Sequence, residues 1–372
     1  MRTPTHIRAA TNGNGAGDAG LRPAASAPAT LQDDDRSASA ASAVGVLRPV
    51  GVVLTIGLIF VTVYLSAFHA PRPHHLPVAA VGTSQQARTL TTSLDHNIPG
   101  GFTVTRMTND RQARYAIEHR RAYAALVSDG RTRTLLYAGA NGPGVTSLLQ
   151  SVSAGVAGGP ITRQDVRPAA AGDTRSLAIF YAAFGVVVAA FLFGTLTYQS
   201  APRLALPPRL ASLTLFGAAG GALIVLIAKA FGAMPGPYAA LAAVIALMAI
   251  AAGAASMTLI RLLGAAGVGV SSVVLLVLGN STSGGVLPPD FLPGWLHPLS
   301  EVLPVGVGVR AVNGLAYFRD DGLITGLAVL LGWIAICVAA LYAEDTLSAR
   351  RSRAKRANLP APTTGESLAQ AA

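Results

Sequence analysis

About six long apolar runs constrain the fold of this chain more than any other feature of its sequence. A membrane-crossing helix needs roughly 20 apolar residues to cover the hydrocarbon core of a bilayer. The chain is 51% hydrophobic and only 12% charged, whereas soluble domains hold roughly 25% charged residues. The sequence therefore predicts a helical bundle in a lipid bilayer. The predicted spans are residues 50–68, 177–198, 210–231, 238–260, 262–279 and 322–343.

The remaining segments divide the chain into regions of different composition. Residues 1–48 are rich in Ala, Gly, Ser, Thr and Pro without apolar periodicity, which predicts a disordered tail. Residues 49–68 form the first span, and residues 69–175 are long enough for a domain. Residues 176–343 hold the other spans, and residues 344–372 form a basic tail.

Alternating and helical patterns in residues 69–175 predict a compact α+β domain. We expect strands at residues 76–81, 102–107, 122–127 and 132–137. We expect helices at residues 84–94, from Asn109 or Asp110 to about Arg120, and after Pro143. The predicted order is β-α-β-α-β-β-α.

The distribution of arginines predicts the orientation of the bundle. Short loops and flanks that are rich in Lys and Arg stay on the cytoplasmic side. The positions counted are Arg36, Arg48, Arg203, Arg209, Arg261, Arg350, Arg351, Arg353, Lys355 and Arg356. All of them fall on one side if six spans are present, which places both termini in the cytoplasm. The predicted fold class is a plasma-membrane all-α bundle of about six transmembrane helices, with an extracytoplasmic α+β domain inserted between helices 1 and 2.

Motifs for enzyme chemistry are missing from the sequence. A phosphate-binding loop needs a Lys after its glycines, and neither residues 13–17 nor residues 139–144 contain one. Exposed histidines are a better explanation of His74 and His75 than a metal site, because adjacent residues on an extended chain point to opposite faces. We predict no catalytic residue, no cofactor and no metal. The basic residues behind the net charge of +11 are scattered and form no recognition motif. Membrane topology explains them better than nucleic-acid binding, so we expect no nucleic-acid partner.

Small residues in the spans at 210–231 and 238–260 leave two interpretations open. They let membrane helices approach closely, either at an interface between subunits or in ordinary packing within the chain. Lys229 lies near the outer end of its run, where snorkelling explains it better than an ion path.

The stretch at residues 279–318 is dense in Gly, Pro and aromatic residues, and it lies between the last two spans on the outer side. Its prolines interrupt any continuous helix. Irregular backbone at membrane depth is tolerated where it is buried in protein or lines a cavity. We therefore predict a re-entrant stretch with a pathway or gating role, and a purely structural lid is the equal alternative. The candidate residues are Asn280, Ser283, Gly284, Gly285, Pro288, Pro293, Pro304 and Arg310.

Three segments resemble a known family of membrane proteins. They are LPVAAVG at residues 76–82, RQARYAIEHRRAYAALV at residues 111–127, and GNSTSGGVLPPDFLPGWLHPLSEVLPVGVGVRAVNGLAYF at residues 279–318. Together with the layout of residues 49–343, they resemble ABC-2 type transporter permeases of the YhgE/Pip (phage infection protein) and nitrosoguanidine-resistance branch. The resemblance implies a second permease half as partner, in a homo- or hetero-dimer, and a separate cytosolic ATPase subunit. It also implies ATPase docking at residues 199–209, with Arg203 and Arg209 as candidates.

These observations predict a permease subunit that exports an apolar or amphipathic substrate across the plasma membrane. The alternative is a non-transporting scaffold or receptor, or a cell-envelope assembly factor, that binds a partner through its outer domain. The lipid bilayer is a partner in either case.

Overall fold

The computed structural model describes residues 30–129, 132–157 and 160–357. Five helices in this part of the chain are long and apolar enough to cross a membrane, which confirms a multi-pass helical membrane protein. These helices are α1 (Thr30–Phe68), α5 (Ala178–Ser200), α6 (Leu206–Ala230), α7 (Tyr238–Leu263) and α11 (Leu323–Ala357). Helices α5, α6, α7 and α11 begin within a few residues of the predicted starts of these spans.

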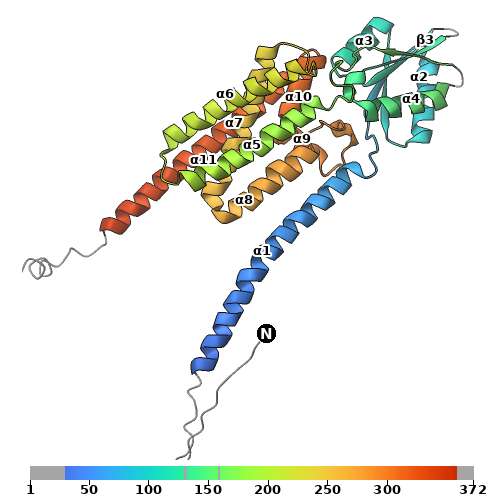
Figure 1. Cartoon of the computed structure of the whole chain (residues 1–372). Coiled ribbons are helices and arrows are strands. Elements are labelled where there is room, and N and C mark those ends of the chain that lie inside the picture. Colours follow the sequence, from blue (N-terminus) through green and yellow to red (C-terminus); the bar gives the residue numbers. More distant parts are fainter. Residues whose placement is uncertain (1–29, 130–131, 158–159, 358–372) are drawn as a thin grey trace, which may run out of the picture. The chain divides into compact units, whose positions relative to one another are not determined.

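Helix α7 is the centre of the bundle. Its most apolar window is 67% buried, whereas the windows of the other four helices are 11% to 33% buried. Helices α5, α6 and α11 pack against it (Figure 1). Added Cβ atoms on Gly217 and Gly221 of α6 would lie 2.9 Å and 2.4 Å from the carbonyl oxygens of Ala246 and Ala242 in α7. These glycines therefore serve helix packing within the chain, the second of the two interpretations above.

The span predicted at residues 262–279 differs from the structure. Helix α7 ends at Leu263, and the next residue, Gly264, has a φ of +59°. The chain continues as α8 (Ala265–Ser271) and the π-helical segment η2 (Ser272–Gly279). Their 15 residues give about 23 Å of helix, which is shorter than the roughly 30 Å hydrocarbon core. The described residues thus hold five full-length spans and one short apolar helix. The predicted run is shortened because its first two residues belong to α7 and the chain turns at Gly264.

The predicted disordered tail also differs over part of its length. Helix α1 begins at Thr30, so residues 30–48 are helical. This segment contains alanines and no proline before Pro49, and alanine is the strongest helix former. Residues 1–29 and 358–372 lie outside the described residues.

The α+β domain contains a five-stranded sheet with strand order β2-β1-β3-β4-β5. Its strands are β1 (Leu76–Val81), β2 (Phe102–Met107), β3 (Ala124–Asp129), β4 (Thr132–Tyr137) and β5 (Thr162–Asp165). Only the β3–β4 pair is antiparallel. The bounds of β1, β2 and β4 agree with the prediction, and β5 was not predicted.

Helices cover both faces of this sheet, and the side chains of each strand alternate between them. Val78 and Ala80 pack toward helices α2 (Ser84–Asn97) and α4 (Pro143–Ala157). Ala79 packs toward α3 (Asp110–Glu118) on the opposite face (Figure 1). Thr83 caps α2 in a capping box with Gln86, and Asn109, one of the two predicted cap residues, caps α3.

Residues 279–318 form three short helical pieces, as their prolines predict. These are η3 (Pro289–Phe291), α9 (His297–Val302) and α10 (Pro304–Tyr317). Helix α10 is almost wholly buried, and a Cβ on Gly308 would lie 2.5 Å from the sulfur of Met248. Since Met248 is about three turns into α7, α10 reaches roughly 15 Å along the bundle.

The loops of the bundle gather at two opposite ends. The first, which we name the domain end, comprises residues 232–237 and 279–318. Gly172 of the α+β segment donates to the carbonyl of Gly232 there (3.2 Å). The second, which we name the tail end, comprises residues 201–209, 261–264 and 344–348, where Arg261 bonds to Ser348 (3.2 Å). This grouping agrees with the two sets of loops that the arginine distribution separates.

Candidate functional site

A cavity of about 510 Å³ lies at the domain end, between the α+β domain and the stretch at residues 279–318. Its walls combine charged, polar and apolar groups. They include Pro77, Arg120, Tyr123, Ser283, Gly284, Pro289, Asp290, His297, Ser300, Glu301, Val302, Val307, Val309, Arg310, Asn313 and Thr325. A cavity of this size falls within the range of small-molecule sites, roughly 300–1,000 Å³.

Apolar contacts fix the stretch against the domain. Phe291 of η3 is 4% exposed, and it packs in the same cluster as Leu76, Val145 and Leu149 of the domain. A Cβ on Gly144 would lie 3.1 Å from a methyl of Leu287. The cavity therefore lies beside a packed joint, and its walls come from both partners of that joint.

A hydrogen bond between Tyr123 and Asp290 lies in the cavity wall. The Tyr123 hydroxyl donates to the Asp290 carboxylate over 2.8 Å, and the His74 amide donates to the Asp290 carbonyl, also over 2.8 Å. Burial raises the pKa of the Tyr123 hydroxyl far above its usual range, and the neighbouring carboxylate of Asp290 raises it further. Tyr123 therefore stays protonated and remains a donor.

Two arginines give the cavity its positive groups. Arg310 of α10 makes a two-pronged ion pair with Asp321, with both N–O distances at 3.2 Å. The guanidinium of Arg120 lies over the ring of Phe318, 4.3 Å from its centroid. Asp290 and Glu301 line the same cavity. Both signs of charge are present, which suits a ligand with separate polar and apolar parts.

The structure brings three of the predicted pathway residues to this cavity: Ser283, Gly284 and Arg310. Ser283 is 3% exposed, and its hydroxyl donates to the Asn280 carbonyl (2.8 Å). Gly284 adopts a φ of +72°, a conformation that glycine accepts without strain.

The other five candidates lie outside the cavity lining. Asn280 is 1% exposed, and its Oδ1 is buried without a hydrogen-bond partner among the described residues. Gly285 packs on Phe180, since an added Cβ would lie 2.9 Å from that side chain. Pro288 and Pro293 accept backbone bonds in the turns around η3, and Pro304 begins α10. Their contacts are structural.

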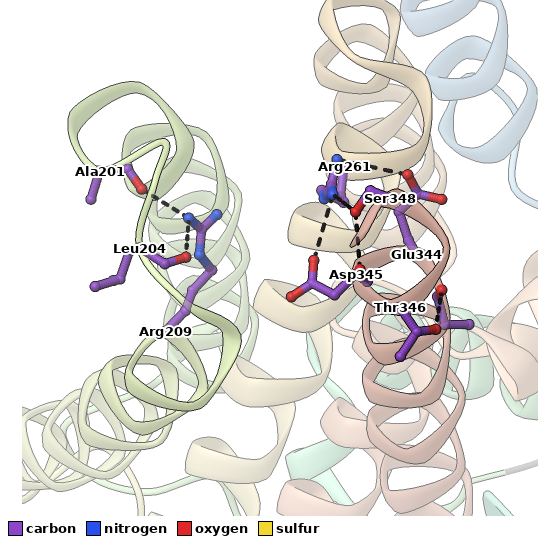
Figure 2. Close-up of polar contacts among 9 residues, drawn as sticks. Ala201, Leu204, Arg209, Arg261, Glu344, Asp345, Thr346 and Ser348 are labelled. Carbon is purple, nitrogen blue, oxygen red and sulfur yellow. Dashed lines mark hydrogen bonds and ion pairs between the residues drawn. The ribbon is translucent and has the colours of Figure 1, made fainter. Parts of the chain in front are cut away.

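The two proposed docking residues, Arg203 and Arg209, both lie at the tail end and differ in exposure. Arg203 is exposed. Arg209 is only 3% exposed, and it donates to the carbonyls of Ala201 (2.8 Å) and Leu204 (3.0 Å), as Figure 2 shows. Arg209 thus holds the α5–α6 loop together, and Arg203 is the one of the two whose side chain reaches the surface.

Of the residues in the cavity lining, sequence reasoning named only Ser283, Gly284 and Arg310. Tyr123 and Asp290 are separated by 167 positions, and neither belongs to a pattern that links them. Glu301, His297 and Asn313 lay within the stretch that was singled out, so their location could have been inferred, but their shared cavity could not.

The described residues contain no group of three or more His, Cys, Asp or Glu side chains placed to hold a metal ion. No protein-family model matches the chain, and comparisons with curated proteins and with solved structures found no match.

Proposed function

We propose that this chain is an ABC-2-like permease subunit that exports an apolar or amphipathic substrate across the plasma membrane, with its domain end outside. The supporting observation is the cavity at the domain end. It lies where three predicted pathway residues meet the α+β domain, and its walls hold both apolar side chains and charges of both signs. Among the predicted substrate classes, these walls favour an amphipathic molecule.

The proposal includes a separate ATPase and a second permease half. The sequence has no phosphate-binding loop of its own, so ATP-driven transport needs another subunit. At the tail end, the exposed Arg203 on the α5–α6 loop is the candidate contact for that subunit.

Accumulation of lipophilic amphipathic dyes in cells with and without the gene tests this function. We expect less dye in cells that hold the gene, and we expect Ser283→Leu to raise accumulation toward the level without it, because leucine would fill the cavity beside Gly284. Gly294→Leu is the matched control. Gly294 lies in the same stretch, and an added Cβ there meets nothing within 4 Å. Equal accumulation with and without the gene across a broad panel would refute export.

One observation favours the alternative of a partner-binding receptor. A surface hollow of about 360 Å³ on the α+β domain is lined by Met107, Arg111, Tyr115 and Arg121. Tyr115 stacks on His119 with ring centroids 3.8 Å apart, and aromatic and arginine side chains are typical of binding surfaces. Copurification followed by mass spectrometry separates the two functions, since a permease brings an ATPase and a receptor brings a different partner.

A further inference from the structure

A second cavity, of about 570 Å³, lies at the tail end. It is bounded by the α5–α6 loop, by the end of α7 and by α11. Its lining includes Tyr198, Arg203, Arg209, Arg261 and Asp345. The arginines in this lining outnumber the single carboxylate.

Arg209 presents a preformed guanidinium at this cavity. One terminal nitrogen, Nη2, holds the Ala201 and Leu204 carbonyls, and the guanidinium lies 4.0 Å from the ring centroid of Tyr198. The other, Nη1, is buried and has no hydrogen-bond partner among the described residues. Figure 2 shows it on the side of the guanidinium away from these two carbonyls. A buried charged donor without an acceptor is unfavourable, so an anionic oxygen that reaches this nitrogen would stabilise it.

The acidic groups at the tail end are already engaged. Arg261 pairs with Asp345 (3.5 Å) and Glu344 (3.8 Å), and it also donates to Ser348 (Figure 2). In the described part of the chain, Arg203 makes no ion pair. Among the described residues, neither Arg203 nor Arg209 therefore has a carboxylate partner.

The position of the cavity indicates the kind of anion. Its apolar walls come from the ends of α6, α7 and α11, which are membrane-spanning helices. Lipid phosphates lie at the level of such helix ends, and basic pockets between helices bind anionic headgroups. Hydrogen bonds between a guanidinium and a phosphate oxygen are charge-assisted and stronger than neutral ones, and in Arg209 the Nη1 group has no other acceptor among the described residues. We propose that this cavity binds a phosphate group, which an anionic phospholipid headgroup or free phosphate can supply. The proposal does not depend on the export function.

Native mass spectrometry of the purified full-length protein tests this site with three probes: phosphatidylglycerol, phosphatidylcholine and inorganic phosphate. We expect the protein to retain phosphatidylglycerol in preference to phosphatidylcholine. Arg203→Ala and Arg209→Lys should each reduce that retention several-fold, since the first removes a charge and the second removes the guanidinium with its unpaired Nη1 donor. Arg353→Ala is the control, because it removes an exposed charge from the basic tail outside the cavity lining.

The probes also distinguish the sources of phosphate. Thermal stabilisation by phosphatidylglycerol alone supports a lipid headgroup, and equal stabilisation by inorganic phosphate supports a free anion. Because Arg203 is exposed, Arg203→Ala remains informative even if Arg209→Lys disturbs the loop. Equal retention of the two lipids together with no stabilisation by inorganic phosphate would overturn the proposal, and so would binding of phosphatidylglycerol or phosphate that neither variant lowers relative to Arg353→Ala.

Discussion

At the scale of single residues, the polar run Asn280–Ser283 explains how η2 can end inside an apolar bundle. Its four side chains are at most 3% exposed. Asn280 donates to the Leu276 carbonyl (3.1 Å), while Ser281 and Thr282 both donate to the Leu278 carbonyl (3.1 and 2.7 Å). The last carbonyls of a helix need such partners when water is absent. This run therefore completes the end of a short helix, and only Ser283 of the four also lines the cavity.

The bond between Tyr123 and Asp290 gives the first prediction at this scale. Tyr123→Phe removes the hydroxyl and leaves the carboxylate with one fewer donor, which should cost about 1.5–3 kcal/mol, the range for hydrogen bonds to charged groups. We expect the unfolding temperature in detergent to fall by a few degrees. Hydrogen exchange at His74, whose amide donates to the Asp290 carbonyl, should become faster.

Tyr115→Phe is the control for this variant. Tyr115 lies in the same domain with 49% of its surface exposed. Its loss of a hydroxyl should leave both measurements unchanged. Similar effects of the two substitutions would mean that Tyr123 does not hold the domain to the stretch at residues 279–318.

At the scale of helices, the contact between α6 and α7 determines how tightly the bundle packs. Gly221→Leu places a side chain where an added Cβ would already lie 2.4 Å from the Ala242 carbonyl and 2.9 Å from the Ala246 nitrogen. Overpacking of this kind costs about 1–3 kcal/mol or more. We expect a lower unfolding temperature and a smaller yield of monodisperse protein after solubilisation.

Gly220→Leu serves as the matched control for Gly221→Leu. It changes the adjacent residue of the same helix, where a Cβ meets nothing within 4 Å. Near-normal stability is expected there. If Gly220→Leu lost stability and Gly221→Leu did not, the contact between α6 and α7 would not determine stability. Such a result would indicate a partner on the other face of α6.

The elements that the sequence predicts well are those with a local cause. β2 alternates apolar and polar residues, and β1 and β4 contain short apolar runs. In α2 and α3 the capping side chain and the amide that it binds are three positions apart. β5 lacks such a signal, because its four residues are Thr, Arg, Gln and Asp and all of them are exposed. The short length of the apolar helix at residues 265–279 depends on the conformation of Gly264, which composition does not reveal.

The residues of the two cavities also divide into those with a local signal in the sequence and those without one. The choice of residues 279–318 rested on local composition, and this stretch does form one wall of the cavity. The opposite wall, at Arg120 and Tyr123, depends on how a separate domain packs. Arg209 shows the same limit, since it was named as a docking candidate and its contacts bury it.

At the scale of the whole molecule, cavities lie at both ends of the bundle, with α7 between them. The cavity at the domain end has charges of both signs, and the cavity at the tail end has an excess of arginine. This difference matches the proposed division of roles, in which substrate leaves at one end and anionic groups bind at the other. The proposed export function depends on the first cavity.

Chemical modification of that cavity during transport tests the proposed export route most directly. Cys337 is the only cysteine in the chain and is 4% exposed, so Cys337→Ser provides a background without reactive thiols. In this background, Glu301→Cys places an exposed thiol in the cavity lining, and Gly294→Cys places one in the same stretch outside the lining. Intact cells are treated with a bulky membrane-impermeant maleimide, and dye export is then measured.

We predict that both thiols react from outside and that export falls only in the Glu301→Cys cells. Complete modification of Glu301→Cys with undiminished export would contradict a route through the cavity. Absence of labelling at both thiols in intact cells, with labelling after permeabilisation, would contradict the proposed outward orientation of the domain end.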